Sequence, residues 1–222
     1  MIVLPSRLKR HLGRLLFGWD IHPTAYLGRS VVFVGHLSMG PGSSIGRFNV
    51  IEGLDELRLA EGANIISRNW ITGIPLSADY FPHSPNRRPS LVMGKHSMIT
   101  LGHRILCSDV VEIGDHSGLA GFGTSILTHS VDLVRDRFVT GPVRIGDNTG
   151  IMSGCTLLSG TRVPSRSVVS AGSVVNTRLT RELTFYRGNP AEAIRDLPET
   201  LGIFHRGDEG SDAMPDPSSA VQ

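Results

Sequence analysis

One histidine of this 222-residue chain stands in a segment whose residue types suit acid–base chemistry. The segment ILTHSVDLVRDRFVTGP spans about residues 126–142, and His129 is its only side chain that titrates near neutral pH. A histidine can remove a hydroxyl proton while the oxygen attacks a carbonyl carbon. Asp132 follows three residues later and is predicted to accept the imidazole Nδ1–H and fix the tautomer. The alternatives are a histidine that only orders the loop and an acid that is only solvated.

The sequence offers no evident covalent nucleophile. Cys107 and Cys155 are the only cysteines, and we interpret them as small buried side chains that stay reduced. Without an activated Ser or Cys, direct transfer to an acceptor is favoured over a covalent enzyme intermediate.

The elements that must position these groups follow a period of six residues. Large apolar residues recur at this spacing, with slips of two residues between some runs. The residue four places after such a slot is usually small or polar, and Gly often follows the slot directly. The slots are Ile21, Leu27, Phe33, Met39, Ile45, Ile51, Leu57, Leu59, Ile65, Ile71, Met93, Ile99, Ile105, Val111, Ile113, Leu119, Ile145, Ile151, Leu157, Val163, Val169 and Val175.

A period of six is neither the 3.6 of a helix nor the simple alternation of a strand. It fits short strands that turn a corner every six residues, with the large side chain inside and the small residue at the bend. Gly tolerates the φ values that such corners demand. Successive coils would then stack as parallel strands about 4.8 Å apart, which predicts a solenoid over residues 21–176.

His103, in the sequence TLGHRI, breaks this rule. It stands four places after a slot, where the repeat usually has a small residue. Because local rule-breaking clusters at functional sites, we expect His103 to lie near the acceptor or the general base.

Two segments lose the period. Residues 73–92, GIPLSADYFPHSPNRRPSLV, contain four prolines and predict a loop that leaves the solenoid. Such a long loop is either functional or a cover over an exposed edge. The second loop, residues 126–142, carries His129.

The repeats, such as IGDNTGIMSGCTLLSGTRVPSRSVVSAGSVV, resemble those of the hexapeptide-repeat acyltransferases, and of the sugar O-acetyltransferases in particular. The resemblance covers about residues 21–190. It implies an all-β fold, a left-handed parallel β-helix in which three hexapeptides form one triangular coil. It also implies transfer of an acyl group, expected to be acetyl, to a sugar hydroxyl of a cell-surface polysaccharide or glycolipid. THSVD followed by GPVRIGDN matches the segment that bears the family's general base, here His129.

The same resemblance implies acetyl-CoA, or another acyl-CoA, as co-substrate and a homotrimer with CoA in a groove between subunits. The closing segment YRGNPA, residues 186–191, would end the solenoid near the CoA. Gly150 stands where the family often has Trp, so the wall on the acceptor side differs. The expected CoA-binding residues are Ser153, Ala171 and Asn176, with Arg187 and Arg195 for the phosphates.

The two ends differ from the solenoid. Residues 1–20 predict a basic amphipathic helix that either caps the first coil or touches anionic membrane, which would suit a lipid-linked sugar. Residues 177–205 form a closing segment, and residues 206–222 have the composition of a disordered tail. No apolar stretch approaches the roughly 18 residues of a membrane-spanning helix. We therefore expect a cytoplasmic protein, with contact to the inner face of the membrane as an open alternative.

Composition and spacing weaken several other classes of function. The formal net charge of +2 gives little support to a nucleic-acid partner. A zinc carbonic anhydrase can have similar repeats, but its metal-binding histidines include a pair five apart, a spacing that no two of the nine histidines here share. We predict no metal. A non-catalytic solenoid scaffold remains the other alternative.

Overall fold

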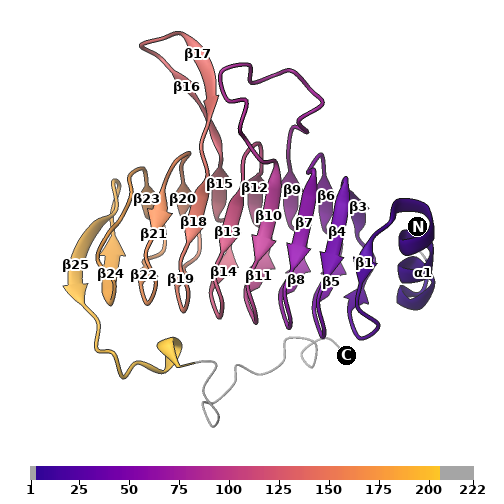
Figure 1. Ribbon diagram of the computed structural model, residues 1–222. Helices are drawn as coiled ribbons and strands as arrows, with labels where there is room; N and C mark the ends of the chain where they lie inside the picture. Colours follow the sequence, from indigo (N-terminus) through magenta and orange to yellow (C-terminus); the bar gives the residue numbers. More distant parts are fainter. Residues whose placement is uncertain (1–3, 206–222) are drawn as a thin grey trace.

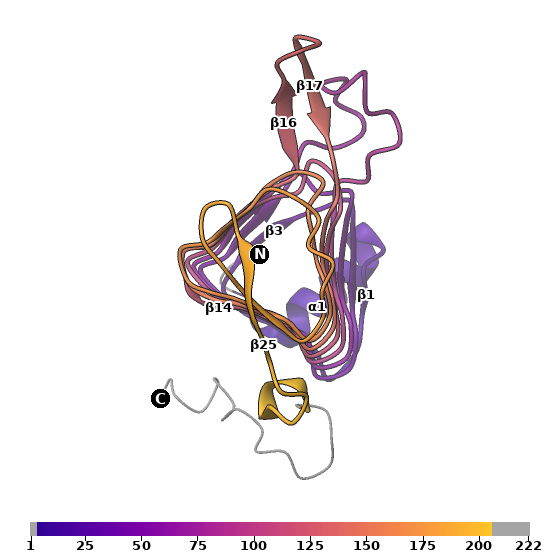
Figure 2. The same ribbon diagram turned by 90° about the vertical axis from the view of Figure 1, so that its left-hand side faces the viewer.

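Three parallel sheets wind around one axis in the computed structural model, which describes residues 4–205 (Figure 1). Viewed along this axis, the coils superimpose as a triangle (Figure 2). The fold class predicted from the sequence is confirmed: the chain is a left-handed parallel β-helix built from six-residue repeats.

Each side of the triangle is one sheet, called here sheet A, B or C in chain order. Sheet A contains β1 (Asp20–Ile21), β4 (His36–Met39), β7 (Glu56–Leu59), β10 (Ser90–Met93), β13 (Val111–Ile113), β18 (Val143–Ile145) and β21 (Arg162–Val163). Sheet B contains β2 (Tyr26–Leu27), β5 (Ser44–Arg47), β8 (Asn64–Ser67), β11 (Met98–Leu101), β14 (Gly118–Phe122), β19 (Gly150–Ile151), β22 (Val168–Val169), β24 (Thr184–Arg187) and the antiparallel β25 (Glu192–Asp196). Sheet C contains β3 (Val31–Phe33), β6 (Val50–Glu52), β9 (Trp70–Thr72), β12 (Arg104–Leu106), β15 (Ser125–Leu127), β20 (Thr156–Leu157) and β23 (Val174–Val175).

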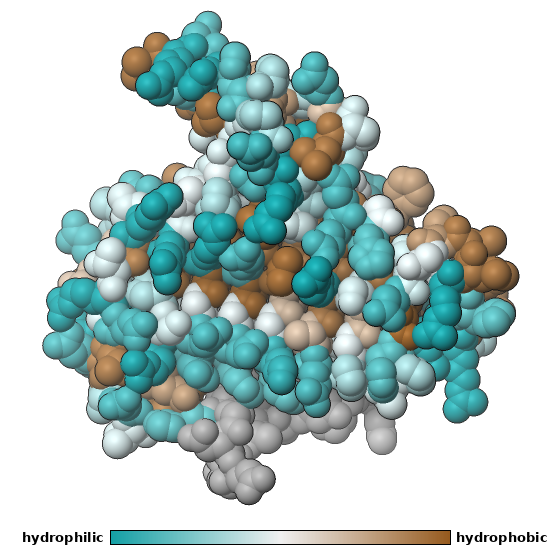
Figure 3. Space-filling model, viewed as in Figure 1, coloured by the Kyte–Doolittle hydropathy of each residue, from teal (hydrophilic) through white to brown (hydrophobic). Residues whose placement is uncertain are grey.

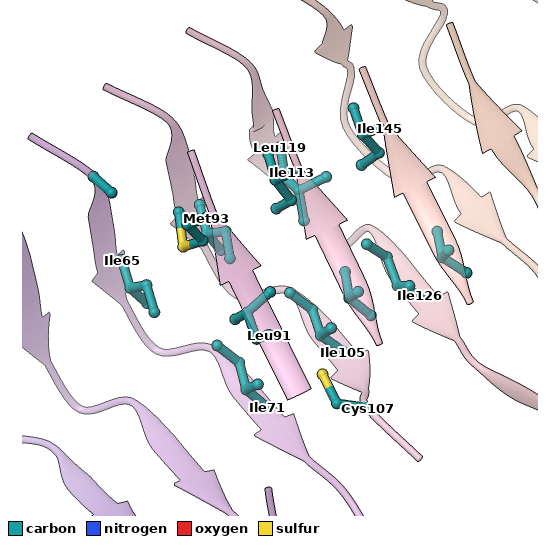
Figure 4. Close-up of a cluster of buried hydrophobic side chains, with 14 of the residues drawn as sticks. Ile65, Ile71, Leu91, Met93, Ile105, Cys107, Ile113, Leu119, Ile126 and Ile145 are labelled. Atoms are coloured by element: carbon teal, nitrogen blue, oxygen red, sulfur yellow. The ribbon is translucent and has the colours of Figure 1, made fainter. Parts of the chain in front are cut away.

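The core is a set of columns of slot residues, each stacked on its equivalent in the next coil. Along sheet B, Ile45, Ile65, Ile99, Leu119 and Ile151 are paired in register and fully buried. Figure 4 shows such inward side chains from several coils. Because each coil buries its large side chains against two neighbours, the period of six in the sequence becomes the packing of the core.

Phe33 is the exception among the predicted core residues. Its side chain is 73% exposed, and Val32 is the residue paired with the buried Ile51. The chain takes five steps from Leu27 to Val32 but six from Ile45 to Ile51, the paired stretch of the next coil, in which Phe48 adopts a φ of 59°. The missing residue shifts the strand by one position and therefore turns Phe33 outward.

A ladder of buried polar groups runs along the corner between sheets B and C, here the BC corner. The backbone N–H of each member donates to the side chain of the previous member, at 2.9–3.1 Å. The ladder ends where the Cys155 N–H donates to the Thr124 hydroxyl. Its side chains are those of Ser30, Asn49, Asn69, His103 and Thr124.

Both interruptions of the repeat leave the solenoid at the same corner, between sheets C and A, here the CA corner. The first, residues 73–89, connects β9 to β10. The second, residues 128–142, connects β15 to β18 and contains the hairpin of β16 (His129–Asp132) and β17 (Arg137–Thr140). A single coil separates them, so they project side by side (Figures 1 and 2).

The ends of the solenoid carry one short helix each. Helix α1 (Ser6–Phe17) lies across the N-terminal end and contacts β1 and β2. A 3₁₀ helix, η1 (Gly202–Phe204), follows β25 at the other end. No helix among residues 4–205 is long and apolar enough to cross a bilayer. The tail predicted over residues 206–222 lies outside the described residues.

Candidate functional site

His129 is the first residue of β16 and lies where the hairpin leaves the solenoid. Its Nδ1 is 3.3 Å from the hydroxyl of Ser108, which belongs to the CA corner of the preceding coil. Its Nε2 makes no hydrogen bond within residues 4–205. The ring is half-buried. Ser108 holds Nδ1 in place, and Nε2 is available to a ligand.

The two excursions are tied together beside this histidine by Asp109. Its carboxylate accepts hydrogen bonds from the backbone N–H of Arg88 in the first excursion, at 3.0 Å, and from the hydroxyl of Thr140 in the hairpin, at 3.1 Å. The N–H of Thr140 in turn donates to the Ser84 hydroxyl, at 3.0 Å. Since Thr140 pairs with His129 across the hairpin, these bonds fix the base of β16.

The first excursion is held in shape by one buried guanidinium. Arg87 is 5% exposed and donates to the carbonyl oxygens of Ile74, Pro75, Ala78 and Ser108. It also lies over the Phe81 ring, with its Cζ 5.1 Å from the centroid. This loop therefore has a defined conformation although it has no regular secondary structure.

Aromatic rings form one wall around the imidazole. The buried Phe81 ring lies 5.7 Å from that of His129, centroid to centroid. Tyr80 contacts both Phe81 and, from the hairpin, Phe138, at 5.0 and 5.6 Å. Tyr80 and Phe138 are about half exposed, so each presents part of its ring to an incoming ligand.

Burial in this setting lowers the pKa of His129 below its usual value of 6.5. Desolvation disfavours the imidazolium and is the cause of this shift. At neutral pH the ring is therefore uncharged, the form that can accept a proton.

The predicted pairing of Asp132 with His129 is not present. Asp132 lies at the far end of β16, where its carboxylate accepts the backbone N–H groups of Val134 and Arg135 and pairs with the Arg135 guanidinium. These bonds, the guanidinium first, lower the pKa of the Asp132 carboxyl. Asp132 therefore shapes the hairpin turn, and Ser108 occupies the place by Nδ1 that the sequence assigned to it.

His103 lies at the BC corner and not at the CA corner, so it does not join this site. It is fully buried in the polar ladder: Nδ1 accepts the Thr124 N–H at 3.1 Å, and Nε2 lies 2.9 Å from the Thr100 hydroxyl. Desolvation lowers its pKa to about 4. This placement argues against the predicted role near the acceptor, because both ring nitrogens are occupied and none reaches solvent.

The residues expected to bind CoA border the outer face of sheet C in the last coils. Ser153 and Ala171 occupy equivalent places on the BC corner of successive coils, and Asn176 follows β23 on the CA corner, the corner of His129. Arg187 and Arg195 lie on β24 and β25, both exposed, with the Arg195 guanidinium over the Phe185 ring at 5.3 Å. Among residues 4–205 there is no cluster of three or more His, Cys, Asp or Glu side chains that could hold a metal.

Solved structures with the same architecture are sugar-modifying and related acyltransferases. A polysialic acid O-acetyltransferase, OatWY, matches 80% of this chain and 84% of its own at 17% identity, with a TM-score of 0.59. AntD, an N-acyltransferase from Bacillus cereus in complex with dTDP and 3-hydroxybutyryl-CoA, matches 86% of this chain and 89% of its own at 15% identity, with a TM-score of 0.57. The chain has the fold of the hexapeptide-repeat acyltransferases.

A shorter match has higher identity. A maltose O-acetyltransferase from Clostridium difficile 630 is 28% identical over 49% of this chain, with a TM-score of 0.46, and the chain spans only 60% of that protein's length. No protein-family model and no curated protein matches the sequence.

The space beside Gly150 is filled by two apolar side chains. A Cβ built on Gly150 would lie 3.1 Å from the Met152 methyl and 3.2 Å from the Ile203 methyl. Ile203 belongs to η1, so the segment after β25 folds back over β19 and occupies the space beside the glycine. A larger residue at position 150 would press on the Met152 and Ile203 side chains, so these would have to shift.

Sequence reasoning missed Ser108, Asp109 and the Tyr80–Phe81 pair. Ser108 and Asp109 stand just before the two-residue slip between Val111 and Ile113. The aromatic pair stands in a loop whose function was left open. The sequence could not show that the first loop, the segment of Ser108 and Asp109 and the hairpin all lie at the CA corner of successive coils.

Proposed function

We propose that the protein is an acyl-CoA-dependent O-acyltransferase that transfers an acyl group, acetyl in the first instance, to a hydroxyl of a sugar in a cell-surface polysaccharide or glycolipid. The observation that carries this proposal is the environment of His129. An uncharged imidazole with Nδ1 held by Ser108 and Nε2 left open stands at the base of the second excursion of an otherwise regular solenoid, beside the first excursion.

His129 is the general base in this scheme. In the tautomer that the reaction needs, Nδ1–H donates to Ser108 Oγ and the Nε2 lone pair is free. Nε2 takes the acceptor hydroxyl proton while the oxygen attacks the thioester carbonyl carbon. As the tetrahedral intermediate collapses, the C–S bond breaks and the imidazolium returns the proton to the thiolate. The products are the sugar ester and free CoA.

The acyl-CoA would lie along sheet C toward the C-terminal end. The outward residues there, Ser125, Thr156 and Val174, are small and stack in register between the two corners, which leaves room for an extended pantetheine arm. Ser153, Ala171 and Asn176 would offer mostly backbone groups, and the Arg187 and Arg195 guanidinium groups would meet the phosphates.

The acceptor would enter from the opposite side, past the excursions. The C–H faces of a sugar ring carry slight positive charge and pack well on the negative faces of aromatic rings. The half-exposed Tyr80 ring offers such a face one ring away from His129, and the half-exposed Phe138 ring offers another beside Tyr80. A lipid-linked sugar is the acceptor form that we favour.

A homotrimer is part of the proposal. One face of a solenoid with one pair of loops supplies only one wall of a site, and a neighbouring subunit would supply the second wall. Sedimentation equilibrium should give three times the chain mass of 24.0 kDa. A fully active monomer would contradict the shared groove between subunits.

The direct test combines binding with transfer. Isothermal titration with acetyl-CoA should show binding that the double variant Arg187→Ala/Arg195→Ala weakens at least about tenfold, whereas Arg58→Ala, an exposed arginine on sheet A, should leave it unchanged. Labelled acetyl should then pass from acetyl-CoA to p-nitrophenyl glycosides of a sugar panel. If the folded protein does not bind CoA, the proposal of an acyl-CoA-dependent enzyme is wrong, and the non-catalytic scaffold is the alternative that is left.

A further inference from the structure

Positive charge is concentrated at one end of the solenoid. Residues 1–51, the helix and the first coils, contain six Lys or Arg residues and one Asp, a net charge of +5. Residues 52–205 contain fifteen of each sign and are neutral overall. The excess positive charge of the chain therefore lies where α1 covers the solenoid.

Helix α1 turns three of its basic side chains toward the first coil. Lys9, 2% exposed, donates to the Gly28 carbonyl at 2.5 Å, and burial together with Arg29 lowers its pKa. Arg10 and Arg14 donate to the carbonyls of Ala25 and Ile21, at 2.7 and 3.0 Å. These carbonyls belong to the first coil, which has no preceding coil to pair with. The Lys and Arg side chains therefore donate the hydrogen bonds that the backbone N–H groups of a preceding strand would otherwise donate.

The consequence is that the apolar side chains of α1 point outward. Leu15 and Leu16 are 71% and 63% exposed, and Leu8 and Phe17 are 43% and 48% exposed. Figure 3 shows apolar surface at the end of the molecule where α1 lies. A single exposed leucine needs no explanation, but several leucines on one short helix form an apolar face that is normally covered.

Three further cations at this end of the solenoid are not used by the cap. Arg7 on α1 and Arg29 and Arg47 on the first two BC corners are exposed, and their side chains make no hydrogen bond or ion pair with other described residues. An apolar helix face bordered by free cations matches the headgroup region of an anionic bilayer, where such helices lie in the membrane plane.

We propose that α1 is a membrane-surface anchor that lays Leu8, Leu15 and Leu16 into the headgroup region of an anionic bilayer. A second copy of the chain is a poorer occupant, because pairing two such ends would bring +5 against +5. The helix has 12 residues, so it lies on the bilayer rather than through it. Such an anchor would keep the His129 site close to sugars carried on membrane lipids, although the anchor itself does not depend on the proposed reaction.

Vesicle co-sedimentation of the full chain tests this proposal. The protein should sediment with vesicles of phosphatidylcholine and phosphatidylglycerol, bind pure phosphatidylcholine at least about tenfold more weakly, and lose affinity at high salt. The double variant Leu15→Glu/Leu16→Glu should abolish binding, and Arg7→Glu should weaken it on anionic vesicles. Both leucines are exposed, so circular dichroism should show an unchanged fold.

The hairpin tip provides the matched control. Leu133 and Val134 are 87% and 94% exposed, which makes them at least as accessible as the α1 leucines. Leu133→Glu/Val134→Glu should bind vesicles like wild type. The proposal is overturned if wild type does not bind, if only the hairpin variant loses binding, or if Leu15→Glu/Leu16→Glu abolishes a self-association in sedimentation equilibrium without changing vesicle binding. Acetyl transfer to a soluble glycoside should be the same in wild type and the three variants, so a failure here is separate from a failure of the proposed reaction.

Discussion

A histidine at the BC corner and a histidine at the CA corner of the same triangle differ in how much of the ring is already used. At the BC corner, His103 is a member of a polar ladder, fully buried, with partners on both ring nitrogens. At the CA corner, His129 has one nitrogen held and the other open, beside loops that leave the solenoid. Burial lowers the pKa of both, so a lowered pKa alone does not separate a structural from a chemical histidine.

The difference lies in what surrounds each position along the chain. A residue that breaks a repeat can still fit it if its side chain takes over the ladder's hydrogen bonds, as His103 does between Asn69 and Thr124. An excursion breaks the repeat for the backbone as well, so its polar side chains are not needed for stacking. Replacing each histidine should therefore affect different properties, turnover for His129 and stability for His103.

Replacing His129 with Ala should have the largest effect. Loss of a general base lowers turnover by about 10² to 10⁴. Affinity for CoA should change little, since the expected CoA contacts lie on later coils. His36→Ala, at an exposed position of β4, is the matched control. Turnover within about threefold of wild type, on protein shown to be folded by circular dichroism, would remove His129 from the mechanism.

Acid should destabilise the protein through His103. Its pKa is about 4 in the fold and near 6.5 when unfolded, so the unfolded chain binds the proton more readily. The stability that the neutral ring supports is complete above pH 6.5 and is lost progressively as the pH falls toward 4, by about 3 kcal/mol. Urea unfolding at several pH values measures this slope.

The variant His103→Asn makes that measurement specific. Asn is the residue that the ladder uses at Asn49 and Asn69, so the fold should be kept. The difference in unfolding free energy between wild type and variant should shrink with acidity if His103 is the titrating group. A difference that stays constant from pH 7 to pH 4.5 would show that another group titrates. Turnover should fall by less than about threefold, because the ring is not in the site.

Ser108→Ala tests the positioning of His129. Without the hydroxyl the imidazole can turn or take the wrong tautomer, and we expect turnover to fall about tenfold. The bond from Nδ1 is stronger to the imidazolium than to the neutral ring, so its loss should shift the acid limb of the kcat/KM profile to lower pH. Ser108→Thr should restore both quantities. A fall in activity with an unchanged pH profile would indicate a purely structural serine.

Asp132→Asn should have the smallest effect. The carboxylate serves the hairpin turn, and an amide oxygen can still accept the two backbone N–H groups. We expect turnover within about threefold of wild type. A loss of turnover as large as that of His129→Ala would instead support the pairing of Asp132 with His129 that the sequence suggested.

The fold could be predicted from the sequence because the period of six has one geometric solution, and the slots that define it are nearly all buried. Phe33 shows where this reasoning stops, since one missing corner residue moves a strand by one position. His129 could be proposed because its segment interrupts the repeat. Its partner could not, because Ser108 reaches it from the previous coil, 21 residues away along the chain. Sequence spacing favoured Asp132, but in a hairpin strand a residue three positions on lies on the other face.

The polar ladder of the BC corner has a direction. Every step runs from the N–H of a later coil to a side chain of an earlier one, from Asn49 back to Ser30 and finally from Cys155 back to Thr124. A finished coil thus presents a ladder acceptor that the next coil fills, and its own ladder N–H is already paired with the coil before it. A chain leaving the ribosome N-terminus first offers its coils in that order, so each turn can template its successor before the rest of the protein exists.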